Sequence, residues 1–287
     1  MASIGPHVNR YHSEKKDATI IDHINTAVNS AKIEADFIVK SASIFVGGPR
    51  DRVIRISEDE IRELRDSRLR IVAHSSYTAH PWKGDPDAAR YIREELMVCK
   101  KANIEGLVIH LPKLPLESVI KYAPRLIIPL SPIIFLEVPA VQNSFYDTPE
   151  KIIDLFRELR DRVNGNFGLC IDTAHLWISG IDMKSYNSAD EWIKKIENHS
   201  DILPRNKIMI HLNDSEQELG VGKDIHAPLG KGKIWGDVNP CASGIAAFID
   251  YANRNKMIII LERKPKEMLI NDYIILRDLI SCSENII

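Results

Sequence analysis

Eight short apolar segments recur along this 287-residue chain, and longer segments with helical periodicity separate them. Most of the eight are rich in β-branched residues, which is typical of buried strands. Strands that alternate with helices form a parallel sheet covered by helices, and eight repeats favour closure of that sheet into a (β/α)8 barrel. The predicted strands are Ser3–Val8, Ser43–Val46, Arg70–Tyr77, Gly106–Leu111, Pro132–Val138, Phe167–Thr173, Lys207–Leu212 and Met257–Arg263.

Between these strands, apolar periodicity predicts helices, for example Thr19–Ala35, Asp87–Ala102, Thr148–Val163 and Pro240–Asn253. The stretch DTPE just before the third of them is a start signal, because a capping residue precedes a proline. The length suits one closed barrel, so we expect an α/β protein with a single TIM-barrel domain over residues 1–287. Residues 220–233 are predicted to form a long loop after the seventh strand, and such loops are commonly functional.

Composition narrows the classes of protein that this chain can belong to. Apolar residues make up 44% and charged residues 27%, which is usual for a globular protein. No apolar stretch is long enough for a membrane span, and the first ten residues do not resemble a secretion signal, so we expect an intracellular protein. The net charge of -2 argues against a broad basic surface for nucleic acid. The widely spaced cysteines suggest reduced core thiols, and they are Cys99, Cys170, Cys241 and Cys282.

Polar residues that can bind a metal close six successive predicted strands, the third to the eighth. They are His74, His110, Glu137, Asp172, His211 and Glu262. In a barrel these carboxyl-terminal ends meet on one face, where such enzymes carry their chemistry. Just beyond two of these ends lie His175, which follows Asp172 by three residues, and the pair Asp224 and His226.

Four carboxylates and five imidazoles on one buried face would be costly without compensating charge, and cations are the simplest source of it. The pattern therefore predicts a site for more than one ion, and mixed histidine and carboxylate ligands fit Zn²⁺, with Mn²⁺ or Fe²⁺ as other occupants. Each residue alone has an ordinary explanation. Asp172 can cap the next helix, His74 or His110 can be a core histidine bonded to a carbonyl, and Glu262 can pair with Arg263. These explanations do not account for the joint pattern.

Three motifs carry a resemblance to a known family. They are HSSY (residues 74–77), CIDTAH (170–175) and HLNDS (211–215) with DIHAPLGKG (224–232) after it. In this order and spacing, they resemble the endonuclease IV type apurinic/apyrimidinic (AP) endonucleases, AP endonuclease family 2. The likeness is greatest to the compact forms encoded by large nucleocytoplasmic DNA viruses, and it runs over nearly the whole chain. Departures such as Ile225 and Lys231 remove no candidate ligand.

The resemblance implies a trinuclear zinc site and a reaction. His74, His110 and Glu137 would hold one ion; Glu137, Asp172, His211 and Glu262 a second; and His175, Asp224 and His226 a third. Glu262 would orient or deprotonate the attacking water, and Glu137 would hold the first two ions together. The family's reaction is hydrolysis 5′ to an abasic site in duplex DNA, leaving 3′-hydroxyl and 5′-deoxyribose phosphate ends. Related 3′-phosphodiesterase and 3′-to-5′ exonuclease activities belong to the same expectation.

The same resemblance suggests residues that contact DNA. Arg50 would be a wedge or a phosphate contact, although it can also be a solvated loop charge, and Tyr77 would lie beside the lesion. His7 closes the first strand and is expected to face the substrate, while Asn213 is expected to order a loop. An abasic nucleotide leaves the helix more easily than a paired one, which is a physical source of selectivity. We expect a monomer that works in the cytoplasm or nucleus, or at viral replication sites or in the virion.

Two other functions stay open at this stage. A sugar isomerase or epimerase of the related barrel class would use the same fold with one or two ions and a catalytic base or lysine. The third group, His175 with Asp224 and His226, counts against it. A non-catalytic protein that binds damaged DNA would not require a complete set of ligands.

Overall fold

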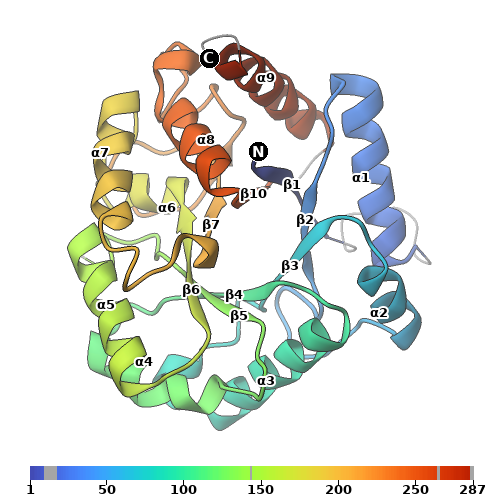
Figure 1. Ribbon diagram of the computed structural model, residues 1–287, viewed down its shortest axis with the longest axis vertical. Coiled ribbons are helices and arrows are strands. Elements are labelled where there is room, and N and C mark those ends of the chain that lie inside the picture. The colour runs from blue at the N-terminus through green and yellow to red at the C-terminus, as the bar shows by residue number, and fades with distance from the viewer. Residues whose placement is uncertain (10–17, 143, 264–265, 285–287) are drawn as a thin grey trace.

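Eight parallel strands close into a barrel, and helices surround it (Figure 1). The computed structural model describes residues 1–9, 18–142, 144–263 and 266–284. Around the barrel the order is β1-β10-β7-β6-β5-β4-β3-β2, with every neighbouring pair parallel, so the predicted (β/α)8 fold is confirmed. The strands are β1 (Ser3–Val8), β2 (Ser41–Phe45), β3 (Arg70–His74), β4 (Gly106–His110), β5 (Ile133–Glu137), β6 (Phe167–Asp172), β7 (Ile208–His211) and β10 (Ile258–Leu261).

Capping side chains set the starts of several helices. The Thr19 hydroxyl accepts the Asp22 backbone N–H while the Asp22 carboxylate accepts that of Thr19, and Ser57 forms the same reciprocal pair with Glu60. The helices are α1 (Ile20–Ala35), α2 (Glu58–Arg65), α3 (Pro86–Lys101), α4 (Leu116–Tyr122), α5 (Pro149–Arg162), α6 (Thr173–Ile178), α7 (Tyr186–Glu197), α8 (Gly244–Asn255) and α9 (Lys266–Glu284). None of the described helices has the length and apolarity to cross a membrane.

The side chains inside the barrel form an apolar plug with a polar layer above it. The plug comprises Val72, Val108, Phe135, Cys170, Met209, Ile258 and Ile260. Successive side chains of a strand point to opposite faces, so the residue two positions after an interior residue also faces the interior. Two positions after Val72 is His74, and two positions after Phe135 is Glu137. The strand ends therefore bring polar groups onto the top of an apolar plug.

Three expectations need correction. The loop after β7 contains a short strand, β9 (His226–Ala227), which pairs antiparallel with β8 (Asp214–Ser215). The predicted helix at 240–253 begins as a single 3₁₀ turn and restarts at Gly244, because Ser243 caps a new helix. Cys241 lies in that turn and is exposed, so its prediction as a core thiol is wrong, whereas Cys99 and Cys170 are buried.

Gly5 lies where β1 approaches β2 most closely. A Cβ atom at Gly5 would lie 1.6 Å from the Ser41 carbonyl oxygen, which is backbone and cannot move aside alone. Gly5 is also paired with Ile260 on the other side, so β1 cannot shift without disturbing β10.

We therefore expect Gly5→Ala to lower the free energy of unfolding by at least about 3 kcal/mol, measured by urea denaturation. Gly222→Ala is the matched control, because nothing lies within 4 Å of its added Cβ, and it should change stability by less than about 0.5 kcal/mol. Equal stability of the two variants would contradict this account of the barrel closure.

Candidate metal centre

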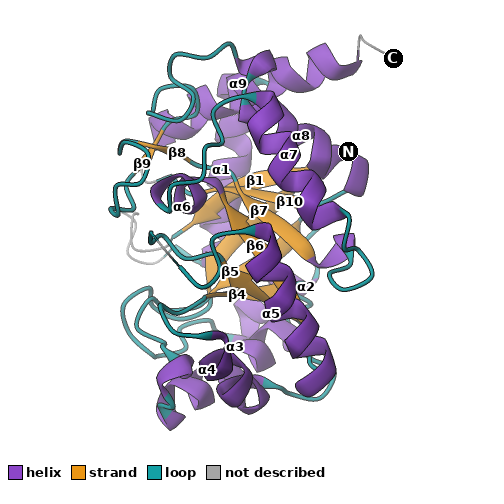
Figure 2. Ribbon diagram, turned by 90° about the vertical axis from the view of Figure 1, so that its left-hand side faces the viewer, coloured by secondary structure: helices purple, strands orange, loops and turns teal. Residues whose placement is uncertain are grey.

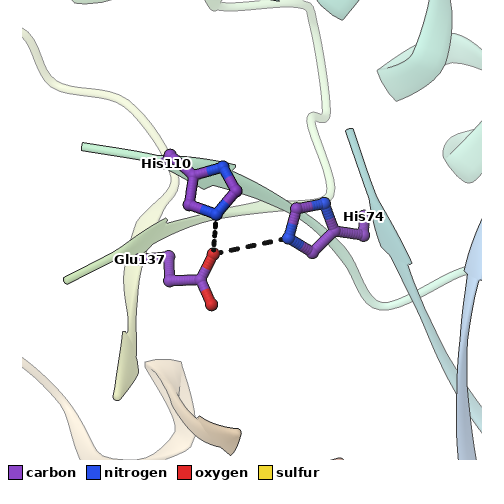
Figure 3. Close-up of side chains that lie close together, drawn as sticks. All are labelled: His74, His110 and Glu137. Carbon is purple, nitrogen blue, oxygen red and sulfur yellow. Dashed lines mark hydrogen bonds and ion pairs between the residues drawn. The ribbon is translucent and has the colours of Figure 1, made fainter. Parts of the chain in front are cut away.

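Glu137 at the end of β5 lies at the middle of the polar layer. One of its oxygens, Oε2, lies 3.3 Å from His74 Nε2 and 2.9 Å from His110 Nε2. Figure 3 shows both imidazoles pointing at this one oxygen. Its other oxygen, Oε1, lies 2.7 Å from His211 Nδ1. A carboxylate with its two oxygens turned toward different histidines has the arrangement of a bridging ligand.

A second group of donors shares Glu137 with the first. Glu137, Asp172, His211 and Glu262 each offer one donor atom, and these atoms lie within 4.8 Å of one another. His211 Nδ1 lies 3.4 Å from Glu262 Oε2 and 3.9 Å from Asp172 Oδ2. The group is buried except for Glu262, whose side chain is 15% exposed.

The third group lies at the start of α6 and in the loop after β7. Asp224 places Oδ2 3.2 Å from His175 Nε2 and Oδ1 2.8 Å from His226 Nε2. Asp172 also lies close enough to belong to this group, since one of its oxygens lies within 4.8 Å of donor atoms of both histidines. The structure thus brings all nine predicted ligands together in the three expected groups, and it adds Asp172 to the third. Metal binding by these residues stays a prediction.

Asp172 is both a helix cap and a member of the cluster. Its Oδ1 accepts the backbone N–H of His175 at 2.9 Å, which starts α6, and its Oδ2 accepts a hydrogen bond from Asn213 Nδ2 at 2.7 Å. Asn213 Oδ1 accepts the backbone N–H of Glu262 at 3.1 Å. The capping explanation of Asp172 is therefore correct but incomplete. Asn213 does more than order a loop, because it fixes two candidate ligands.

Three of the histidines are held in the tautomer that a metal ligand bonded through Nε2 requires. Nδ1 of His74 donates to the Ser75 carbonyl at 2.8 Å, and Nδ1 of His175 donates to the Val138 carbonyl at 2.7 Å. Nδ1 of His226 lies 3.1 Å from the Glu262 carbonyl in the same arrangement. A proton fixed on Nδ1 leaves the Nε2 lone pair directed at the carboxylates, as the outer hydrogen bond does in metal sites generally.

The buried carboxylates of these three donor groups need positive charge nearby to balance them. Burial acts to lower the pKa of His175, but the charge of Asp172 and the hydrogen bond to Asp224 outweigh it and raise that pKa well above its usual value. Burial acts to raise the pKa of Glu137, but His110 and His211 outweigh it and hold that pKa well below its usual range. Protons on histidine or bound cations must balance these carboxylates. The mixed donor set fits divalent ions such as Zn²⁺.

Asp214 fixes the loop that carries Asp224 and His226, and sequence reasoning missed this residue. Its buried carboxylate accepts four backbone N–H bonds, from Ser215, Gly230, Gly232 and Ile234. Asp272 of α9 adds a fifth anchor by accepting the Leu229 N–H at 2.7 Å. The available signal was an aspartate just after a strand, followed by a glycine-rich loop whose amides need acceptors.

Glu95 is a second residue that sequence reasoning missed. It is buried on α3 and accepts a hydrogen bond from the Ser75 hydroxyl at 2.5 Å, directly beside His74. Burial raises the pKa of Glu95 to about 8, so the carboxyl is largely neutral at pH 7. Its signal was its position between Ile92 and Cys99, on the apolar face of an amphipathic helix.

The three predicted DNA contacts lie around this centre. Tyr77 is 47% exposed, its ring centroid lies 5.4 Å from that of His74, and its backbone N–H donates to Pro49 O, which brings the loop of Arg50 alongside. Arg50 is exposed. His7 faces inward, with Nδ1 3.8 Å from Glu262 Oε1. Contact of these three residues with DNA stays a prediction.

Comparison with known proteins identifies the family of this chain. The family model described as a xylose isomerase-like TIM barrel matches residues 31–242. The "Probable AP endonuclease" of African swine fever virus (strain Badajoz 1971 Vero-adapted) is 38% identical over 236 residues, which cover 79% of this chain and 80% of the viral protein. The "Probable endonuclease 4" of Nitrosopumilus maritimus (strain SCM1) is 32% identical over 45% of this chain and 43% of that protein.

Solved structures give the same result. The crystal structure described as "AsfvAP:AG" has a TM-score of 0.92 and 33% identity, and the alignment covers 97% of this chain and 99% of that one. Endonuclease IV from Thermus thermophilus shares the fold, with a TM-score of 0.71, 23% identity and 99% coverage of both chains. The chain therefore belongs to the xylose isomerase-like TIM barrel family, and within it to the endonuclease IV type AP endonucleases.

Proposed function

We propose that this protein is an AP endonuclease that hydrolyses the phosphodiester bond 5′ to an abasic site in duplex DNA, leaving a 3′-hydroxyl and a 5′-deoxyribose phosphate. The observation that carries the proposal is Glu137, whose two oxygens join two of the three converging donor groups at the barrel mouth. The relatives named AP endonuclease over most of this chain support it. One barrel domain carries the activity, as a monomer.

Three divalent cations complete the site in this proposal, with Zn²⁺ favoured by the donors and Mn²⁺ or Fe²⁺ as alternatives. When bound, such cations supply Lewis acidity toward the phosphodiester and positive charge for its transition state. The charge of three divalent cations exceeds that of four carboxylates, so the loaded site attracts phosphate although the chain has a net charge of -2. His74, His110 and Glu137 hold one ion; Glu137, Asp172, His211 and Glu262 the second; and His175, Asp224 and His226 the third.

Two glutamates of the site differ in their access to solvent, and this difference supports the roles that we propose for them. The Glu137 side chain is 1% exposed and surrounded by histidines, so it suits a structural ligand. The Glu262 side chain is 15% exposed and directs Oε1 toward His7 across 3.8 Å. We therefore assign to Glu262 the orientation of the attacking water and acceptance of its proton, because only this carboxylate of the second group reaches the open mouth.

The rival function is a sugar isomerase or epimerase on the same fold. A D-tagatose 3-epimerase-like protein has a TM-score of 0.62 at 15% identity, which reflects the shared barrel. The third donor group favours the nuclease, because His175, Asp224 and His226 extend the site beyond the one or two ions that an isomerase requires.

The test is incision of a duplex that contains one tetrahydrofuran abasic analogue, with the product ends mapped. We expect a single cut on the 5′ side of the analogue with a 3′-hydroxyl, and loss of that activity after chelation. Cleavage on the 3′ side, or no incision by protein that carries its metals, would contradict the proposal. If the metal-loaded protein makes no incision, turnover of sugars would support the isomerase or epimerase function. Binding of abasic duplex without cleavage would instead indicate a protein that binds damaged DNA.

Glu262→Gln removes a charge without changing the shape of the side chain. We expect incision to fall by at least about a thousandfold, while the affinity for the abasic duplex stays within about threefold, measured by fluorescence polarisation. Glu216→Gln is the control, because Glu216 is an exposed glutamate outside the donor groups, and it should behave as the wild type. Metal content measured on the same samples separates loss of a ligand from loss of a proton acceptor. Near-normal incision by Glu262→Gln would exclude the assigned role.

Tyr77→Ala removes the exposed ring at the mouth. We expect affinity for the abasic duplex to fall about tenfold, since stacking on an aromatic side chain contributes about 1 to 3 kcal/mol per base. Tyr77→Phe should keep that affinity, because the ring is retained. Metal content should not change in either variant. Equal affinities for the three proteins would show that Tyr77 does not contact the substrate.

A further inference from the structure

A groove on the outer wall of the barrel carries a local excess of positive charge. Two adjoining hollows of about 420 and 610 Å³ share Met97 and Lys101, and together they form what we call the α3 groove. Its rim has one acid, Glu94, and five cations, which are Arg65, Arg90, Arg93, Lys100 and Lys101. The chain as a whole has a net charge of -2, so this is a local concentration of cations.

Three of these cations hydrogen-bond to backbone carbonyls. Arg65 Nε donates to the Lys101 carbonyl at 2.8 Å, Arg93 donates to the Arg125 carbonyl at 2.6 Å, and Lys100 Nζ donates to the Pro129 carbonyl at 2.9 Å. Carbonyl groups orient these side chains without neutralising them. Within the described parts of the chain, no carboxylate forms an ion pair with any of the three. Arg90 and Lys101, by contrast, pair with carboxylates.

Apolar side chains form the floor of the same groove. They are Ile54, Met97, Val98 and Ile128, and the Met97 side chain is 44% exposed at their centre. Methionine adapts its shape to an apolar partner, and exposed methionines are common at binding surfaces. At one end the groove adjoins Leu130, which shares a neighbouring hollow with Lys100 and Asn103. Leu130 is 87% exposed with φ of 52°, an uncommon backbone conformation for a leucine.

The groove lies apart from the metal centre. Helices of this barrel run opposite to the strands, so the last residues of α3, Lys100 and Lys101, lie toward the amino-terminal ends of the strands. The donor groups lie at the carboxyl-terminal ends. In Figure 1, α2 and α3 are neighbours on the outside of the barrel, and Figure 2 shows α3 on the wall, away from the β8 and β9 loops. A ligand in the groove would leave the mouth open to DNA.

We propose that the α3 groove binds an acidic segment of a partner protein that carries leucine-like apolar residues. Acidic side chains complement the cationic rim, and apolar side chains cover Met97 and the floor around it. Duplex DNA fits less well, because a phosphate backbone would use the rim and leave the apolar floor uncovered. From Arg90 to Lys101 the helix spans about 16 Å, enough to accommodate about three helical turns of a bound segment.

The probe is a fluorescein-labelled 14-residue peptide of glutamate, alanine and leucine, with two leucines one helical turn apart. We expect saturable binding to the intact protein by fluorescence polarisation, weakened about tenfold when salt rises from 50 to 200 mM. Arg93→Glu and Lys100→Glu should each weaken binding at least about fivefold, and Met97→Asp at least about tenfold. Lys194→Glu on α7 is the matched charge control and should have no effect.

Incision of abasic duplex should be unchanged in all four variants, since none lies near the donor groups, and an unfolding measurement on each variant checks that it is folded. Three results would overturn the proposal. The first is no saturable binding, or equal binding of a peptide with serine in place of leucine, which would reveal only a diffuse charge effect. The second is displacement of the peptide by undamaged duplex together with equal loss of duplex affinity in Lys100→Glu, which would assign the groove to DNA. The third is a dimer, detected by sedimentation, that dissociates when these residues are substituted. That result would assign the groove to contact between two copies of this chain.

Discussion

The alternation of side chains along a parallel strand is the constraint from which the rest of this structure follows. Inside a closed barrel, residues two apart on one strand lie one above the other. His110 therefore lies above Val108, His211 above Met209, and Glu262 above Ile260. The apolar residues fill the barrel, and their neighbours in the next layer face the mouth. The same pattern stabilises the fold and assembles the site.

The polar layer is stable only if its charges are compensated. Its carboxylates and imidazoles lie on a buried apolar plug, where an unbalanced charge is costly. The backbone carbonyls that hold His74 and His175 fix the proton on Nδ1, and they leave Nε2 directed inward. Asn213 ties Asp172 to the backbone of Glu262. These hydrogen bonds orient the candidate ligands, as outer hydrogen bonds do in metal sites generally.

The sequence was sufficient to predict the barrel and the convergence of six polar residues at its mouth, because strand ends in a parallel barrel must meet on one face. It could not assign Asp172 to two donor groups, since that depends on the position of α6 relative to β7. The hydrogen bonds that Asp214 accepts could not be predicted, because their donors are backbone amides and every residue type except proline has one. The exposure of Cys241 was missed because the helix was expected to be continuous through Ser243. The α3 groove depends on the packing of α2 beside α3, which the periodicity of either helix alone does not determine.

We propose that nine side chains at the barrel mouth hold three metal ions. Crystals of protein loaded with zinc would show this, with anomalous diffraction recorded on both sides of the zinc absorption edge. We expect three peaks, one beside His74 and His110, one beside His211 and Glu262, and one beside His175 and His226. A single peak or a pair of peaks, with the group around His175 and Asp224 left without metal, would contradict it.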